Sequence, residues 1–386
     1  MKLKRIPEDF QVEELTTVVA DGGGFALYCL TKRSLGTPEA IEAIARCWNL
    51  PRHCISYGGL KDKHALTRQY VTVRHGLRRG LEQPQFELQY LGQTARAFTP
   101  HDIAGNRFNI VLRDLSVSAL AQAEAALGET LACGLPNYFD DQRFGSVGES
   151  REFIAHPWCL GNYERALWLA LADAHPHDRP DEREQKRLIR EYWGRWPECK
   201  AALARSNRRS IITYLADKPG DFKGAFARMR ADLRGIYLAA FQSFLWNRLL
   251  AAQIRQAVPA DQLCHVPLEM EPAPFFRTLD PGRRAELAAA VIPLPSARSR
   301  WNMGLWLPLL EQILAEFGME LRQLRVKHPR DSFFSKGSRA ALIAPAAVGH
   351  RSEPDELYPR RHKLALQFEL PRGAYATILV KRLTEC

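Results

Sequence analysis

One aspartate is distinguished by its neighbours. Asp62 lies between Lys61 and Lys63 in a glycine-rich segment, 58–67, that reads as a turn before a strand. A carboxylate can act as a nucleophile, and an adjacent ammonium favours its ionised form and can also meet a phosphate. A single aspartate in a turn is more often solvated or caps the backbone, and each lysine can equally be a plain surface charge. The chemistry at Asp62 therefore needs support from the rest of the chain.

A second segment, 136–145, combines aromatic, polar and turn-forming residues, as functional loops often do. The amide of Asn137 can both donate and accept hydrogen bonds. The ring of Phe139 can stack on a base or pack in the core. Arg143 can bind a phosphate or support the loop. Asp140 and its neighbour Asp141 also suggest a Mg²⁺ site. Adjacent carboxylates in a loop are usually solvated, however, so we predict no metal.

The composition is that of a folded globular protein with a basic surplus. The chain has 386 residues, of which 46% are hydrophobic and 25% charged, and its formal net charge is +11. The length favours two domains. The charge favours a polyanionic partner such as nucleic acid, although a solvated basic surface would give the same count.

Several classes of protein find no support in the sequence. The eight cysteines include no C-x-x-C pair, which argues against a zinc ribbon or finger. The first residues lack the apolar stretch of a signal peptide, and no apolar run reaches the ~18 residues of a membrane span. We therefore expect a cytoplasmic protein without a membrane segment.

The periodicity of the chain predicts strands at both ends and helices between them. Gln11 to Ala20 and Phe25 to Lys32 read as a hairpin joined by a glycine turn, and Thr37 as the N-cap of a helix ending near Trp48. Further strands are expected at 69–73, 108–112, 363–370 and 375–380, and further helices from Ser118 to about Gly134, over 233–245 and over 308–317.

This strand–helix–strand order indicates an insertion within a sheet domain. The character of the chain changes near Tyr163, where it becomes helical and rich in charge. We predict one domain formed by 1–160 and 350–386, and a second domain, 161–349, inserted into it.

Three segments together resemble the TruD family of pseudouridine synthases. They are Gly58 to Gln69, which is similar to the family's Gly-x-Lys-Asp-Lys-x-Ala-x-Thr-x-Gln motif; Asn137-Tyr138-Phe139 followed by Gln142 to Gly145; and Gly373 to Thr377. Supporting matches are Pro7 to Phe10 with Val12-Glu13, Gly105 to Phe108, and Gln242 to Asn247. All six occur in the family's order and span almost the whole chain.

The resemblance implies an α+β fold: a catalytic domain on a mixed, mainly antiparallel sheet, with a family-specific α/β domain inserted. It implies isomerisation of uridine to pseudouridine in tRNA, at position 13, without cofactor or metal. Asp62 then matches the catalytic nucleophile, and Phe10, Asn137 and Tyr375 the residues that hold the flipped base. We count Lys61, Phe139 and Arg143 as further substrate contacts. We expect a monomer whose partner is tRNA, with no protein partner.

One departure from the family's pattern and several alternatives remain. The family usually has glycine where this chain has Asp140, and aspartate tolerates left-handed backbone better than most residues. The rival functions are a non-catalytic RNA-binding protein or RNA chaperone, and a nucleoside glycosylase that releases free uracil. The sequence does not decide whether Asp62 attacks the ribose or the base.

Overall fold

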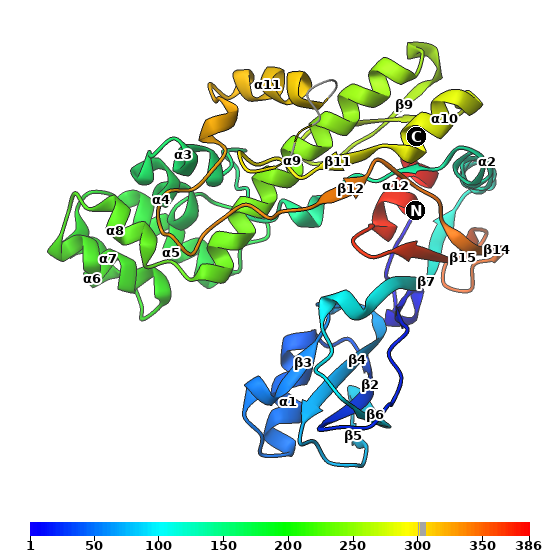
Figure 1. Ribbon diagram of the computed structural model, residues 1–386, viewed down its shortest axis with the longest axis horizontal. Coiled ribbons are helices and arrows are strands. Elements are labelled where there is room, and N and C mark those ends of the chain that lie inside the picture. Colours follow the sequence, from blue (N-terminus) through cyan, green and yellow to red (C-terminus); the bar gives the residue numbers. More distant parts are fainter. Residues whose placement is uncertain (300, 302–305) are drawn as a thin grey trace. The chain divides into compact units, whose positions relative to one another are not determined.

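The computed structural model describes residues 1–299, 301 and 306–386, which form two compact units (Figure 1). Unit 1 comprises Met1–Leu135 and Ile343–Cys386, and unit 2 comprises Pro136–Leu342. Two short strands, β8 (Leu135–Pro136) and β13 (Leu342–Ile343), lie where the chain passes from one unit to the other.

Unit 1 is built on a nine-stranded sheet. Its order is β14-β15-β7-β1-β4-β2-β6-β5, with β3 also paired to β4, and every pairing is antiparallel except that of β1 with β4. The strands are β1 (Phe10–Thr16), β2 (Phe25–Arg33), β3 (Ile55–Tyr57), β4 (Leu66–Arg74), β5 (Leu81–Gln83), β6 (Phe86–Thr94), β7 (Ile103–Leu115), β14 (Ala346–Pro354) and β15 (His362–Pro371).

The predicted hairpin of the first two strands is wrong. β4 lies between β1 and β2 and pairs with both. The glycine loop does not fold β2 back on β1, since Gly22 N donates a hydrogen bond to Gln93 O near the end of β6. Glycine-rich turns report local backbone freedom only. Five consecutive buried residues in β2, Ala26–Leu30, mark it instead as an inner strand covered on both faces.

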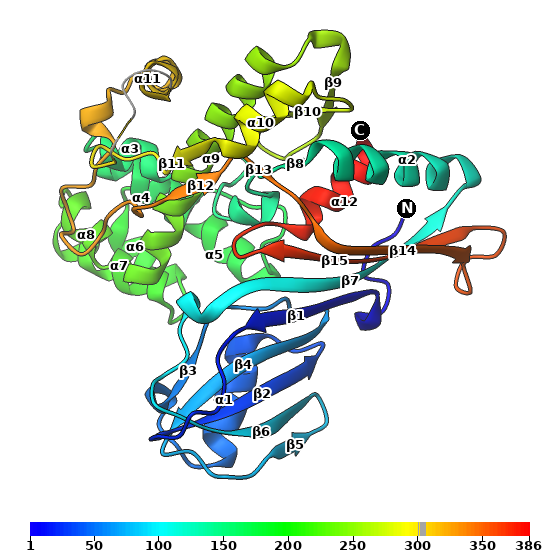
Figure 2. The same ribbon diagram turned by 45° about the vertical axis from the view of Figure 1, so that its right-hand side comes forward.

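Three helices pack on this sheet (Figure 2). They are α1 (Thr37–Cys47), α2 (Val117–Cys133) and α12 (Ala376–Glu385). The apolar side of α1, with Ala40, Ile41 and Ile44 fully buried, joins a core with β2 and β4. α2 contacts α12, β7 and β15. The alternating face of β15 is confirmed, since Leu364, Leu366, Phe368 and Leu370 are all buried.

Three local predictions in unit 1 need correction. The segment 375–380 is not a strand, because Ala376, Leu379, Val380 and Leu383 bury the face of helix α12 at helical spacing. The two predicted N-caps lie one or two positions too late in the chain. Ser116, not Ser118, caps α2 by accepting a hydrogen bond from Ala119 N. Thr37 is the first residue of α1 rather than its N-cap, which is Gly36.

Unit 2 is mainly helical. Its helices are α3 (Ala155–Cys159), α4 (Tyr163–Leu171), α5 (Pro180–Glu191), α6 (Trp196–Ala202), α7 (Asn207–Asp217), α8 (Phe222–Ala227), α9 (Ala231–Ala257), α10 (Pro281–Ala289) and α11 (Trp306–Glu316). Its short strands are β9 (Leu263–Val266), β10 (Ala273–Phe276), β11 (Val291–Pro293) and β12 (Ser338–Ala340).

The 27-residue helix α9 is the centre of unit 2, and Figure 1 shows it as the longest helix of the unit. Phe241, Leu245, Trp246 and Leu249 on it are completely buried. It contacts α3, α11, β10 and β11. The predicted amphipathic helix over 233–245 is thus confirmed. Five of its apolar residues belong to the core, namely Tyr237, Ala240, Phe241, Phe244 and Leu245, whereas Ile236 is 50% exposed.

The observed units differ in their bounds from the predicted domains. The second unit begins at Pro136 and ends at Leu342, whereas the prediction placed the insertion over 161–349. The loop 136–145 therefore belongs to unit 2. The mixed, mainly antiparallel α+β fold is confirmed.

Candidate active site

The turn that carries Asp62 connects β3 to β4 and is fastened by two buried side chains. Thr37 Oγ1 accepts a hydrogen bond from Lys61 N (3.0 Å) and donates one to Gln69 Oε1 (2.8 Å). Gln69 Nε2 donates in turn to Gly59 O (3.2 Å). Thr37 and Gln69 are both 0% exposed. The start of α1 and the inner strand β4 thus fix the backbone from Gly59 to Lys61.

A buried lysine from β2 completes the support. Lys32 Nζ donates hydrogen bonds to three backbone carbonyls, those of Leu35 (2.6 Å), Lys61 (3.3 Å) and Asp62 (2.8 Å). Its side chain is fully buried. Burial lowers the pKa of Lys32 to about 8, although the negative charge of Asp62 opposes this shift. The ammonium therefore holds the turn that carries Asp62, at a cost in desolvation.

The depressed pKa of Lys32 predicts a pH-dependent stability. The unfolded chain, with an ordinary lysine pKa of 10.5, binds more protons than the folded chain above pH about 8. This group therefore makes the protein more stable as pH rises from about 8 to 10.5. We expect the free energy of unfolding of wild type, relative to Lys32→Met, to increase between pH 7.5 and 9.5 in guanidinium titrations. Parallel pH profiles for the two proteins would contradict the assignment.

The carboxylate of Asp62 is open to solvent and has one cationic partner. Lys4 Nζ lies 2.7 Å from Asp62 Oδ2, and the two side chains are 27% and 40% exposed. Among the described residues, Asp62 Oδ1 has no hydrogen-bond partner. The arrangement is a solvent-accessible carboxylate with one oxygen engaged by Lys4 and the other without a hydrogen bond to any described residue.

Phe10 lies beside this ion pair but is buried. Lys4 Nζ lies 4.0 Å from the centroid of the Phe10 ring, and Phe108 packs edge-on at 6.4 Å. Phe10 is only 3% exposed. In this conformation its ring contributes a wall under Lys4, and stacking of a base on it would first require Lys4 to move.

The two lysines that flank Asp62 differ completely. Lys61 Nζ lies 2.7 Å from Glu14 Oε1, with side chains 9% and 0% exposed. The other oxygen, Glu14 Oε2, accepts a hydrogen bond from Tyr70 N (2.9 Å). Lys63 is 54% exposed and lies 3.9 Å from Glu39. The surface-charge alternative therefore holds for Lys63 and is wrong for Lys61, whose side chain anchors the turn to β1 and β4.

The remaining predicted site residue of unit 1 is Tyr375. It is the N-cap residue of α12, half-buried, and its carbonyl accepts a hydrogen bond from Ile378 N (3.1 Å). It follows the end of β15, where Pro371 pairs with Gly105 of β7. Unit 1 thus contains Phe10, Lys61, Asp62 and Tyr375. Phe10 and Asp62 both contact Lys4, whereas the side chain of Lys61 contacts Glu14.

The other three predicted residues belong to unit 2. Asn137 is 6% exposed; its Nδ2 donates to Ala340 O (3.0 Å), and its Oδ1 accepts from Arg339 Nη2 (2.6 Å). Arg339 also donates to Asn137 O through Nε (2.7 Å). Both halves of the Asn137 amide are therefore engaged within the unit, and reading a base edge would require at least one of them to be released.

Phe139 and Arg143 form a stacked cluster. The Phe139 ring packs at 5.5 Å against Trp246 of α9, and the guanidinium groups of Arg143 and Arg339 lie 5.3 and 4.3 Å from its centroid. Asn247 brackets the Phe139 backbone, accepting from its N–H (2.9 Å) and donating to its carbonyl (2.8 Å). Of the alternatives weighed for these residues, the geometry favours the core for Phe139 and loop support for Arg143.

Asp140 fits its position without strain. Its backbone is extended, with φ −88° and ψ 167°, so the left-handed conformation considered for this position is not adopted. Asp141 Oδ1 accepts a hydrogen bond from Glu269 N (2.7 Å). No group of three or more His, Cys, Asp or Glu side chains within the described ranges could hold a metal ion.

Sequence reasoning missed Lys4, Glu14 and Lys32. The first residues carry no motif, so nothing in the sequence marks Lys4. Lys32 lies inside a strand, and the sequence gives no sign that its side chain is buried. Glu14 falls in the same strand as the motif residues Phe10 and Val12, so its inward side could have been inferred from strand alternation. Lys4 has no comparable signal, because its contact with Asp62 spans 58 residues.

An exposed carboxylate on a turn between two strands, paired with a lysine, defines a candidate site for catalysis by a carboxylate. Comparison with known proteins identifies the class of protein. The family model described as tRNA pseudouridine synthase D (TruD) matches residues 1–383. This chain therefore belongs to the TruD family of tRNA pseudouridine synthases, which are isomerases that act on tRNA.

Individual relatives agree over nearly the full length. The chain is 31% identical over 389 aligned positions to a probable tRNA pseudouridine synthase D 2 of Methanocaldococcus jannaschii, covering 99% of this chain and 91% of that protein. It is 27% identical to the tRNA pseudouridine synthase D of Aquifex aeolicus, covering 99% and 98%. The crystal structure of a putative TruD from Methanosarcina mazei shares the fold, with a TM-score of 0.74, 23% identity and coverage of 100% and 93%.

Over the described residues, no helix is both long enough and apolar enough to cross a bilayer.

Proposed function

We propose that this protein converts the uridine at position 13 of tRNA to pseudouridine, with Asp62 as the nucleophile. The observation that supports this most is the Asp62 carboxylate, 40% exposed on a turn that Lys32, Thr37 and Gln69 immobilise, with Lys4 Nζ 2.7 Å away. Family membership supplies the reaction, and the immobilised carboxylate supplies a group suited to its first step. Phe10, Asn137 and Tyr375 are proposed as contacts of the flipped base on the family motif alone, and Phe139 and Arg143 as residues that shape the loop of Asn137.

Formation of pseudouridine breaks one bond at ribose C1′ and forms another. The bond between ribose C1′ and uracil N1 breaks, the base turns, a bond forms between C1′ and C5, and the proton on C5 is lost while N1 gains one. Asp62 in its ionised form can attack either C1′ or the base. Lys4 fixes the carboxylate orientation, so that the unengaged oxygen faces the substrate. The product is an isomer, so neither an oxidant nor an energy source is required.

Product analysis separates this proposal from its rivals. tRNA is incubated with the protein, digested to nucleosides and analysed by chromatography and mass spectrometry. The proposal predicts pseudouridine, an isomer of unchanged mass, formed at the expense of uridine. Free uracil with an abasic site would identify a nucleoside glycosylase. Bound but unmodified tRNA would identify an RNA-binding protein or RNA chaperone.

Lys4→Met tests the role of the cation beside the carboxylate. We expect the single-turnover rate to fall by roughly 10²-fold, the effect of removing one well-placed donor from an active site, and Lys4→Arg to recover part of it. Lys2→Met is the matched control, because Lys2 is exposed and forms no ion pair with any described residue. Equal rates for Lys4→Met and Lys2→Met would show that the ion pair is only a surface contact.

A further inference from the structure

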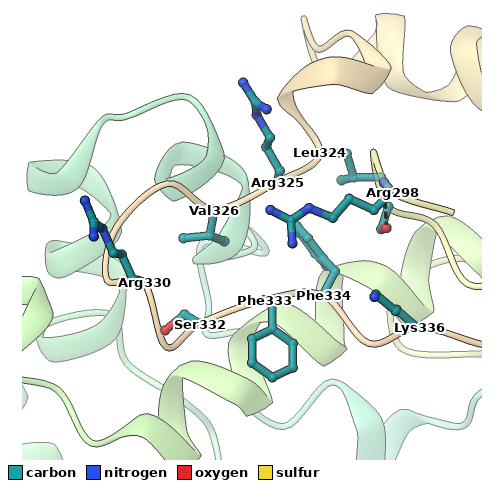
Figure 3. A pocket seen from close by; sticks show the side chains of 10 residues that line it. Arg298, Leu324, Arg325, Val326, Arg330, Ser332, Phe333, Phe334 and Lys336 are labelled. Carbon is teal, nitrogen blue, oxygen red and sulfur yellow. Dashed lines mark hydrogen bonds between the residues drawn. The ribbon is translucent and has the colours of Figure 1, made fainter.

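A basic pocket in unit 2 lies outside every motif considered above. It has a volume of about 290 Å³ and is lined by residues of two segments, 296–298 and 324–336 (Figure 3). Its floor is formed by the buried side chains of Ser296, Leu324, Ser332 and Phe334. Four cationic side chains, those of Arg298, Arg325, Arg330 and Lys336, line it and are all exposed.

The charge of this pocket is not compensated. None of its four cations forms an ion pair with an acidic residue in the described part of the chain, and no acidic side chain lines the pocket. The acid nearest in sequence, Asp331, is held by Arg234 Nη2 at 2.6 Å. Four like charges with no counter-ion repel one another, so their proximity is most favourable when an anion is bound.

An exposed aromatic ring accompanies the charges. Phe333 is 71% exposed, the most exposed phenylalanine of the described residues, although a ring of this size is normally buried. Its neighbour Phe334 is 6% exposed and supplies the core contact for this segment. Phe333 is one of the residues that line the pocket, and Figure 3 shows its ring pointing away from Arg298 and Arg325, with Lys336 to its right. A free aromatic face beside phosphate-binding cations is the combination used to bind unpaired nucleotides.

We propose that this pocket binds an unpaired nucleotide of the RNA, with a phosphate on the arginines and lysine and the base stacked on Phe333. The inference rests on the proposed action on tRNA and adds a contact for that substrate within unit 2. The pocket volume, near the lower end for small-ligand sites at about 300 Å³, suits one nucleotide rather than a duplex. A duplex base is unavailable for stacking because it is already stacked.

The test compares three sets of substitutions in the full-length protein. The first set neutralises three pocket cations together, Arg325→Gln, Arg330→Gln and Lys336→Gln. The matched control removes the same charge elsewhere in unit 2, with Arg205→Gln, Lys223→Gln and Arg284→Gln, which are exposed and lack ion pairs to described residues. A third pair, Phe333→Ala and Phe333→Trp, tests stacking without changing charge.

Affinity for a tRNA transcript is measured by fluorescence anisotropy from low to moderate salt. For the pocket triple variant we expect binding at least about 10-fold weaker than the control triple, and a salt dependence shallower by about two in log–log slope. Phe333→Ala should bind roughly 5- to 100-fold more weakly, and Phe333→Trp should bind as wild type does.

Because tRNA binding is measured independently of catalysis, the proposed function and the proposed pocket can be contradicted separately. If wild type forms no pseudouridine but the pocket variants bind tRNA more weakly than the control triple, the proposed function is overturned and the pocket proposal is retained. Active wild type with pocket variants that match the control triple in affinity and salt slope would overturn the pocket proposal and point to another anionic partner, such as an acidic peptide. Loss of binding in Phe333→Trp equal to that in Phe333→Ala would exclude stacking.

Discussion

Asp62→Asn is expected to abolish pseudouridine formation while leaving the fold and tRNA affinity intact. The asparagine has nearly the same shape but carries no negative charge, so it is a poor nucleophile and loses the ion pair with Lys4. We expect the single-turnover rate to fall by at least about 10³-fold, as when an enzyme loses its nucleophile. Because Asp62 is 40% exposed, the substitution should change the free energy of unfolding little.

The substitution should leave the conformation of the turn unchanged, so that a loss of activity reports on the side chain alone. The carbonyl of residue 62, which accepts the hydrogen bond from Lys32, is unchanged in Asp62→Asn. A variant that retains most of its activity would show that Asp62 is not the nucleophile. A variant that is inactive but also unfolded or unable to bind tRNA would show that the side chain acts through structure.

The second large effect is expected at Lys61. Lys61→Met leaves the completely buried carboxylate of Glu14 without its cation. Breaking a buried ion pair by removing one partner costs about 3–5 kcal/mol in the free energy of unfolding. The turn would also lose its anchor to β1, and a displacement of about 1 Å at Asp62 is enough to reduce activity by about 10²-fold. Both changes are measurable, by denaturant unfolding and by single-turnover kinetics.

Lys63 supplies the matched control, two residues away on the other side of Asp62. Lys63→Met removes the same charge at an exposed position, 3.9 Å from the exposed Glu39, and should alter stability by less than about 0.5 kcal/mol. Combining Lys61→Met with Glu14→Gln removes both buried charges and keeps an acceptor for Tyr70 N. We expect that double variant to regain much of the lost stability. Equal effects at Lys61 and Lys63 would contradict the buried anchor.

The fold could be predicted where periodicity is long and unambiguous. Helix α9 shows apolar residues at helical spacing over several turns, and β15 alternates over its whole length. Helix α12 was misassigned because Ile378, Leu379 and Val380 form a short apolar run that fits a buried strand or a helix equally well. The β1–β2 pairing was wrong because strand order depends on tertiary contacts, here the insertion of β4.

The site could be predicted where a motif marks the reacting group, and not where a residue acts through its surroundings. Asp62 follows from its motif, and its exposure agrees with a reacting role. Lys61 also belongs to the motif, yet its partner Glu14 is known only once β1 and β4 lie side by side. Lys4 and Lys32 are ordinary lysines by sequence, and only the packing of β2 and the chain start against the turn gives them their contacts.

The most direct measurement of the central claim is tritium release from two tRNA transcripts labelled at uridine C5, one natural at position 13 and one with cytidine there. Forming the C1′–C5 bond expels the label, so release counts isomerised uridines. The account predicts one equivalent of tritium per molecule of the first transcript and none from the second. Equal release from both, or no release from either by protein that binds them, would contradict it.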